Sequence, residues 1–357
     1  MTVVWGMLRV SALLGVLLLI ACGDDGRVAP SDVPTADMGP VPSADGGDTG
    51  EGDAFVPTSP LVDPACVDGM YSEVLPAVDA DISDLTWAGD VGAYVDAFLD
   101  RRYPVGAALV RGGRTNTDYG QDCDVLYAGS PSSAGDVIDR MNTIVHECGH
   151  FYDGELSTFT DNTYVVTPTQ QISCSRGDAT DRGGDTFARS RINDDEYAAL
   201  RPACPSGSSG PDCDFYADTY LDGDPDNGNF EGGDQGFNML IEEAFQYVNS
   251  LATSWSVLDQ SPPGRSTTAR DGILTFLWYV ERYLRMARLD FPGAYERLSG
   301  DACWRDAILT LWGRAWLYLE ATTGMDGLSI HGDALETLVL DTDLLAEIER
   351  IRAAHGC

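Results

Sequence analysis

The residues best suited to chemistry in this chain lie together at 146–150, which read His-Glu-Cys-Gly-His. On an α-helix, side chains four residues apart lie one turn apart on the same face. His146 and His150 placed in this way can both bind one Zn²⁺ ion. Glu147, between them, can accept a proton from a water molecule activated by that ion. The spacing therefore predicts a zinc site with its own general base.

The surrounding residues predict the helix that this spacing requires. From 137 to 153 the apolar residues recur at helical intervals on one side, and both histidines lie on the opposite, polar side. Pro131-Ser132-Ser133 marks the expected start and Gly154 the expected end. The chain has only four histidines, so a chance pairing of two around a glutamate is rare. The alternatives are an amphipathic helix with ordinary surface groups, or a site that kept the motif and lost its activity.

This segment resembles the zinc-binding helix of the zincin metallopeptidases, and the resemblance covers that one helix. It implies that His146 and His150 are zinc ligands and that Glu147 is the catalytic base. It also implies an α+β fold that is predominantly helical, with a small sheet, the active-site helix and a helical C-terminal part.

A catalytic zinc needs a third protein ligand and an open position for water. The metzincin pattern requires glycine at 153 and histidine at 156, where this chain has Asp153 and Leu156. The Gly-Thr-x-x-Asp segment of the aspzincins is absent downstream, and the other two histidines, His331 and His355, lie far along the chain. These departures leave a glutamate on a second helix, which is the gluzincin arrangement.

Residues 237–252 have the helical spacing expected of that second helix. The run Ile241-Glu242-Glu243-Ala244-Phe245 resembles the glutamate-bearing helix of the gluzincins, including the lethal-factor-like branch. Periodicity does not decide between Glu242 and Glu243 as the ligand. We prefer Glu243, because Tyr247 follows one turn later on the same side and can join the site as a catalytic residue. A solvated helix edge is the alternative interpretation of the two acids.

Two features depart from the family's pattern. Gluzincins carry a supporting acid four residues after the ligand, where this chain has Tyr247, so Asp153 is a candidate for orienting an imidazole instead. The separation of 93 positions from His150 to Glu243 also indicates a long inserted region. Hydrolysis further needs a donor for the oxyanion. The candidates are Tyr247, Tyr216, Tyr220 and His331.

The overall charge excludes some partners. The chain of 357 residues has a net charge of −35, and all 22 of its basic residues are arginine. So acidic a surface opposes binding to nucleic acid and to anionic lipid headgroups. With 43% hydrophobic residues the chain can still bury a sizeable core. The expected partner is a peptide or protein substrate.

The N-terminal region predicts export and attachment to a membrane. Residues 1–21 have the features of a signal peptide, and the sequence around Cys22 resembles the bacterial lipobox, in which the cysteine is lipidated. Residues 22–60 are acidic and rich in Pro, Gly and Ser, which predicts a disordered tether. The catalytic domain is then expected over 61–357, with a helical subdomain at about 267–357. These features place the protein in the bacterial cell envelope, facing the periplasm or the cell surface, and attached to the membrane through its lipid anchor only.

Eight further cysteines predict disulfides in an exported chain. The best local pair is Cys204 with Cys213, which closes a loop rich in Pro, Ser and Gly. Cys148 lies inside the motif on the apolar side, so a free buried thiol is the alternative there.

The remaining segments predict the elements around the site. Strands are expected at 107–110 and 125–128, around a turn at Arg111-Gly112-Gly113-Arg114, and a loop-rich region at 154–236. That region holds a candidate strand at 163–167, a short helix at 194–200, and an acidic turn from Asp222 that resembles part of a Ca²⁺ loop. Further helices are expected at 90–102, 271–288, 302–322 and 341–354.

Taken together, the sequence predicts a lipid-anchored zinc metallopeptidase, a hydrolase of peptide bonds. Two alternatives remain open: a non-catalytic surface lipoprotein that uses the scaffold for binding, and a zinc amidase that acts on a non-peptide or cell-wall amide.

Overall fold

The computed structural model describes residues 54–118, 120–177, 180, 187–205, 208, 210–223, 232–262 and 264–357. The predicted signal peptide, Cys22 and nearly all of the tether lie outside these residues, as does most of the candidate calcium loop. The described chain is predominantly helical with one two-stranded antiparallel sheet, which confirms the predicted fold class. Within the described ranges, no helix has the length and apolar character needed to cross a membrane.

The α-helices are α1 (Val67–Met70), α2 (Val91–Arg102), α3 (Pro104–Gly113), α4 (Cys123–Ala128), α5 (Ala134–Ile138), α6 (Met141–Leu156), α8 (Ala217–Tyr220), α9 (Phe237–Ser256), α10 (Ala269–Asp290), α11 (Pro292–Gly300), α12 (Ala302–Ala321), α13 (Gly332–Val339) and α14 (Thr342–His355). The strands are β1 (Asp161–Thr167) and β2 (Gln170–Ser175). Short 3₁₀ helices are η2 (Arg189–Asp194), η3 (Ala198–Leu200), η4 (Gly232–Asp234), η5 (Leu258–Gln260) and η6 (Asp326–Leu328).

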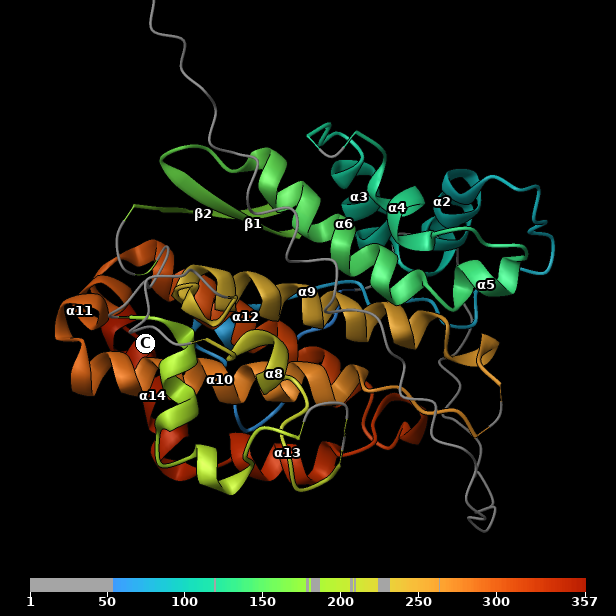
Figure 1. The fold of residues 1–357 in the computed structure, drawn as a ribbon. Helices are drawn as coiled ribbons and strands as arrows, with labels where there is room; N and C mark the ends of the chain where they lie inside the picture. Colours follow the sequence, from blue (N-terminus) through green and yellow to red (C-terminus); the bar gives the residue numbers. More distant parts are fainter. Residues whose placement is uncertain are drawn as a thin grey trace, which may run out of the picture.

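Helix α9 lies at the centre of the fold. Figure 1 shows α6 along one side of it, with α2, α3, α4 and the hairpin beyond α6, and with α10 and α12 on its other side. Nearly every residue of α9 is buried, including its polar ones. A helix buried all round must satisfy its polar side chains against its neighbours, and α9 does so mainly against α6.

The predicted motif helix is present but is divided into two. Ser133 caps α5 through a capping box with Asp136, so the chain begins a helix where the serine signal predicts it. The chain then breaks at Asp139 and Arg140, and α6 runs from Met141 to Leu156. Gly154 does not end the helix, because α6 continues for two more residues.

The strands predicted at 107–110 and 125–128 are wrong. Both segments are helical, in α3 and α4, and the sheet lies after the motif helix instead of before it. Gly112 and Gly113, which suggested a turn, lie where α3 packs closely on α6. A Cβ atom on Gly113 would approach the Cys148 carbonyl oxygen to 2.4 Å, and one on Gly112 would come within 2.3 Å of the Tyr152 ring. These glycines serve close helix packing, with no need for a turn.

The later predictions are largely confirmed. The strand at 163–167 is β1, which pairs antiparallel with β2. Helices α2, α9, α10, α12 and α14 match the predicted segments to within a few residues. The helix predicted at 194–200 is replaced by the two short 3₁₀ turns η2 and η3.

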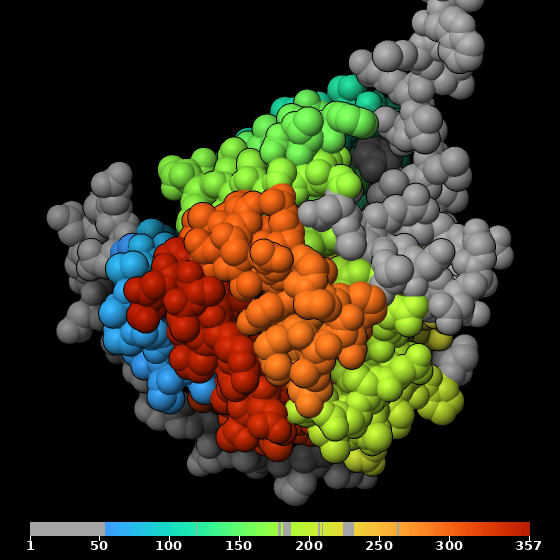
Figure 2. Space-filling model, turned by 90° about the vertical axis from the view of Figure 1, so that its left-hand side faces the viewer, coloured from blue at the N-terminus to red at the C-terminus, as the bar shows by residue number. Residues whose placement is uncertain are grey.

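All eight cysteines of the described region form disulfides. The predicted pair Cys204–Cys213 is confirmed. Cys148 is bonded to Cys123, so the free-thiol alternative is wrong, and this bond joins α4 to the side of α6 that faces away from α9. The others are Cys174–Cys303 and Cys66–Cys357. The last pair joins the two ends of the domain, which lie side by side in blue and red in Figure 2. Four disulfides are typical of proteins outside the cytoplasm.

Candidate metal centre

Helices α6 and α9 pack antiparallel with polar side chains matched along the interface. Near the start of α6, Asn142 Nδ2 donates to Ser254 Oγ at 2.7 Å. One turn later, His146 Nδ1 lies 2.9 Å from Ser250 Oγ. After a further turn, His150 Nδ1 lies 2.6 Å from Glu242 Oε1. Later positions on α6 therefore pair with earlier positions on α9. This antiparallel pairing brings the acids of α9 to the motif histidines.

Gly149 makes this close approach possible. A Cβ atom at this position would lie 1.9 Å from Oε1 of Gln246, so any larger residue would displace the Gln246 amide from its place over the glycine. The Gln246 amide packs over the glycine and donates to Asp153 Oδ2 at 3.0 Å. The backbone N–H of Val165 donates to the other carboxylate oxygen of Asp153 at 2.7 Å, which ties strand β1 to α6. Asp153 therefore holds α9 and the sheet in place and does not orient an imidazole.

Three side chains converge at the interface. His146, His150 and Glu243 each offer one donor atom, and these atoms all lie within 4.8 Å of one another. His146 Nε2 and His150 Nε2 are 3.0 Å apart. Glu243 Oε2 lies 3.6 Å from His146 Nε2 and 3.5 Å from His150 Nε2. A tetrahedral zinc with bonds near 2.1 Å separates its ligand atoms by about 3.4 Å. The donor set and its spacing therefore fit a zinc ion.

The other nitrogen of each ring already has a partner. A carboxylate oxygen accepts hydrogen bonds, so His150 donates its Nδ1–H to Glu242 Oε1. Ser250 takes the corresponding place for His146. With Nδ1 engaged on both rings, Nε2 of both is left to face Glu243. Metal-bound histidines are usually held in this way by a second group.

The charges at the interface call for a cation. Burial alone lowers the pKa of His150, but the carboxylates of Glu242 and Glu243 outweigh it and raise the pKa well above its usual value. Burial raises the pKa of Glu243, yet the two imidazoles reverse this and hold it below its usual value. Among the described residues, one oxygen of each acid, Glu242 Oε2 and Glu243 Oε2, is buried without a hydrogen bond. A divalent ion against Glu243 would compensate this excess of acceptors.

The catalytic candidates lie at different distances from this group. Glu147 is buried on α6 between the two histidines. The Tyr247 ring meets the His146 ring edge to face at 5.0 Å, and its hydroxyl lies 2.9 Å from that of Tyr220. The structure thus brings Tyr247 against His146, with Tyr220 on Tyr247.

The other two donor candidates have partners of their own. The Tyr216 ring packs 5.4 Å from the Tyr247 ring, and its hydroxyl donates to Thr268 Oγ1 at 3.3 Å. His331 lies at the start of α13, where its backbone N–H donates to Asp271. It is not part of the convergent histidine and glutamate group.

Sequence reasoning missed Ser250 and Gln246. The signal for both was available: Gln246 and Ser250 lie four and eight residues after Glu242 on the same helix, so they share its face. Polar residues at such spacing inside a helix with an apolar stripe indicate a polar interface with a partner helix, here α6.

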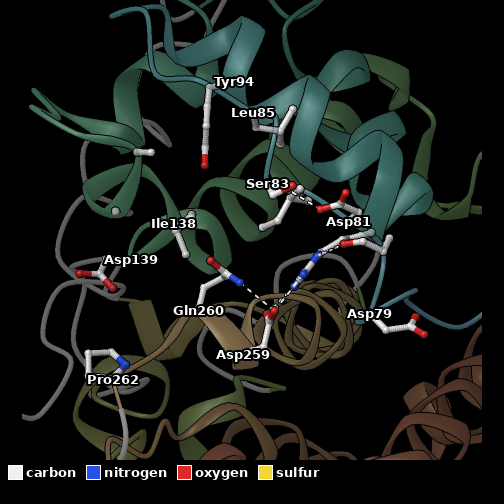
Figure 3. Close-up of a pocket in the computed structure, with 15 residues that line it drawn as sticks. Asp79, Asp81, Ser83, Leu85, Tyr94, Ile138, Asp139, Asp259, Gln260 and Pro262 are labelled. Carbon is white, nitrogen blue, oxygen red and sulfur yellow. Dashed lines mark hydrogen bonds and ion pairs between the residues drawn. The ribbon is translucent and has the colours of Figure 1, made fainter. Parts of the chain in front are cut away.

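A cavity of about 770 Å³ lies elsewhere, at the end of the α6–α9 interface. Figure 3 shows its lining, which includes Asp79, Asp81, Asp139 and Asp259. Its one guanidinium, on Arg102, is fully engaged with the Asp259 carboxylate and with the carbonyl oxygens of Ser256 and Ala80. None of the histidines or glutamates of the convergent group lines it.

No family model, no curated protein and no solved structure matches this chain. The resemblance to the zincins therefore rests on the motif, the helical fold and the buried group of His146, His150 and Glu243, which could hold a metal ion.

Proposed function

We propose that this chain is a zinc-dependent metallopeptidase with His146, His150 and Glu243 as its zinc ligands and Glu147 as its general base. The observation that carries the proposal is the convergence of the three ligand atoms within 4.8 Å, on the face of α6 where the motif predicts them. The glutamate comes from a second helix, which is the arrangement that the gluzincin resemblance implies.

The residues present fit the chemistry of peptide hydrolysis. When bound, zinc lowers the pKa of water toward neutrality and polarises a carbonyl group. Glu147 takes the proton from the attacking water and returns it to the leaving amine. We assign the donor toward the oxyanion to Tyr247, a role that its ring contact with His146 and its hydroxyl contact with Tyr220 support. Burial excludes bulk water from these groups and strengthens each interaction.

The location belongs to the same proposal. The four disulfides support a protein outside the cytoplasm. Lipidation at Cys22 would then attach the domain to a bacterial membrane through the acidic tether, where it would act on peptide or protein substrates in the envelope.

The test compares the wild-type chain with Glu147→Gln. Zinc content is measured by elemental analysis and turnover with a library of quenched fluorescent peptides. Glu147→Gln should retain its zinc and lose about 10²–10⁴-fold in turnover. Glu155→Gln, an exposed change of the same kind on the same helix, is the matched control and should keep both.

Three results would contradict the proposal. Zinc-loaded wild-type protein that cleaves no peptide would indicate a binding module. Cleavage of cell-wall amides without cleavage of peptides would indicate an amidase. A chain that binds no zinc would remove the basis for both the peptidase and the amidase.

A further inference from the structure

Two neighbouring acids on α9 face two different atoms of the same imidazole. Glu242 Oε1 lies 2.6 Å from His150 Nδ1, while Glu243 Oε2 lies 3.5 Å from His150 Nε2. Adjacent residues on a helix point about 100° apart, so Glu242 and Glu243 approach His150 from different directions and meet different nitrogens of its ring. The histidine is therefore held between them.

The two contacts have different chemical characters. A distance of 2.6 Å is short even for a charge-assisted hydrogen bond between an N–H and a carboxylate. The distance from Glu243 is longer, and it is shared almost equally with His146 Nε2, at 3.6 Å. The first contact is a formed bond, whereas the second leaves room between three donor atoms for an ion.

Glu242 is also poorly placed to bind the ion itself. Nδ1 and Nε2 point to opposite sides of the imidazole ring, so a carboxylate engaged with Nδ1 is turned away from the point where Nε2 meets Glu243. The group of converging ligand atoms accordingly contains Glu243 and not Glu242.

We propose that Glu242 is a positioning residue for His150. By accepting Nδ1–H, it fixes the tautomer that leaves Nε2 free, and it sets the rotation of the ring toward His146 and Glu243. The Glu242–Glu243 pair therefore divides two tasks between adjacent residues: Glu243 binds the metal, and Glu242 holds a ligand. This inference rests on the metal-binding part of the proposed function and does not depend on the substrate.

The experiment measures zinc affinity by competition with a chromophoric chelator. The variants are Glu242→Ala and Glu242→Gln, with Glu155→Gln as the control of equal charge change. Glu242→Ala should weaken zinc binding by about 10–100-fold. Glu242→Gln should lose less, because its amide oxygen can still accept Nδ1–H. Glu155→Gln should bind as the wild type does.

Two spectroscopic readouts separate positioning from a merely structural or a ligand role. The imidazole N–H signal of His150 in the zinc-loaded protein should be protected from exchange in the wild type and lose that protection in Glu242→Ala. The visible spectrum of the Co²⁺-loaded protein should be the same in both, because the ligand set is unchanged. Circular dichroism of each variant establishes that it is folded. If Glu242→Ala does not fold, the comparison is made with Glu242→Gln.

Wild-type zinc affinity in Glu242→Ala, or a Co²⁺ spectrum that shows a lost ligand, would overturn the inference. The two proposals can fail separately. If wild-type protein binds zinc and both Glu242 variants match it, only the positioning role is wrong. If the variants behave as expected but no peptide is cleaved, the positioning role stands and the peptidase assignment is wrong.

Discussion

Glu73 and Glu243 are both buried carboxylates, yet their surroundings differ. Glu73 accepts from Nε and Nη2 of Arg314 and from the hydroxyls of Tyr71 and Tyr318, so both of its oxygens are satisfied and its charge is balanced. We call these four residues the Glu73 cluster. Glu243 faces two imidazoles, with its Oε2 atom 3.5 and 3.6 Å from their Nε2 atoms, and this oxygen accepts no hydrogen bond from any residue that the structure describes.

The two regions are connected by hydrogen bonds. Arg314 donates to the Tyr103 hydroxyl, which donates to Asn249 on α9. Asn249 in turn donates to Gln246, the residue that packs over Gly149. Helix α9 is therefore connected to two buried acidic groups. In the Glu73 cluster the Arg314 guanidinium balances the carboxylate, whereas the group around Glu243 has more hydrogen-bond acceptors than donors among the described residues. The difference supports the proposal that the second group holds an ion from outside the chain.

The largest expected effect is on the Glu73 cluster. Arg314→Met leaves the Glu73 carboxylate buried without its cation, which should reduce the free energy of unfolding by about 3–5 kcal/mol. Chemical denaturation of the oxidised protein measures it. The double variant Glu73→Gln with Arg314→Met is the control and should recover much of the loss. A loss below about 1 kcal/mol, the scale of an exposed ion pair, would mean that the cluster is not the completed unit described here.

The second prediction concerns the histidine group. Zinc at about 100 to 1,000 times its dissociation constant should stabilise the wild-type protein by about 2.7–4.1 kcal/mol. His146→Ala and Glu243→Gln should lose this response, because each removes a ligand. Thermal unfolding with and without zinc, in metal-free buffer, measures the shift. An equal shift in the wild type and in both variants would place the ion elsewhere.

The third prediction uses a buried acid that has neither a cation nor a metal group. Glu281 on α10 is fully buried, and neither of its oxygens has a hydrogen-bond partner within the described part of the chain. Burial, with Asp341 and Glu347 nearby, raises its pKa well above the usual 4.5. At a pH below the usual pKa, the Glu281 carboxyl is protonated in both the folded and the unfolded chain, so its titration does not lower the free energy of unfolding. As the pH rises toward the raised pKa, the unfolded chain ionises first and stability falls.

Replacing this residue should therefore remove a pH-dependent cost. Glu281→Gln should stabilise the protein by about 1–3 kcal/mol at pH 8 and by less at pH 4, measured by denaturation at both values. Equal stabilisation at the two pH values would indicate that the carboxyl does not titrate in this range.

The smallest effect is expected at the surface. Arg111 and Asp100 form an ion pair at 2.8 Å with both side chains about half exposed. Asp100→Asn should change the unfolding free energy by about 0.2–1 kcal/mol, and 1 M salt should reduce the difference further. A change as large as that of Arg314→Met would remove the contrast between exposed and buried pairs.

The sequence predicted best what depends on local spacing. The two histidines and Glu147 share a helix, so their relation is set by four-residue periodicity. Helix α9 was predicted for the same reason, and Glu243 was preferred as the ligand. Ser250 and the role of Glu242 were not predicted, because they depend on how two helices are aligned, and periodicity within one helix does not fix that alignment.

The errors have a common physical cause. Gly112 and Gly113 have the composition of a turn, but their small size serves the contact with α6. Cys148 lies on the apolar side as predicted, yet its partner Cys123 is on another helix. In both places the tertiary contact, and not the local sequence, determines the structure.

The bond between Cys66 and Cys357 has a consequence for damage to the chain. The two cysteines enclose almost the whole domain in one covalent ring. A single backbone cut anywhere between them opens the ring but releases no fragment. A copy nicked by a peptidase would therefore migrate as one piece until its disulfides are reduced.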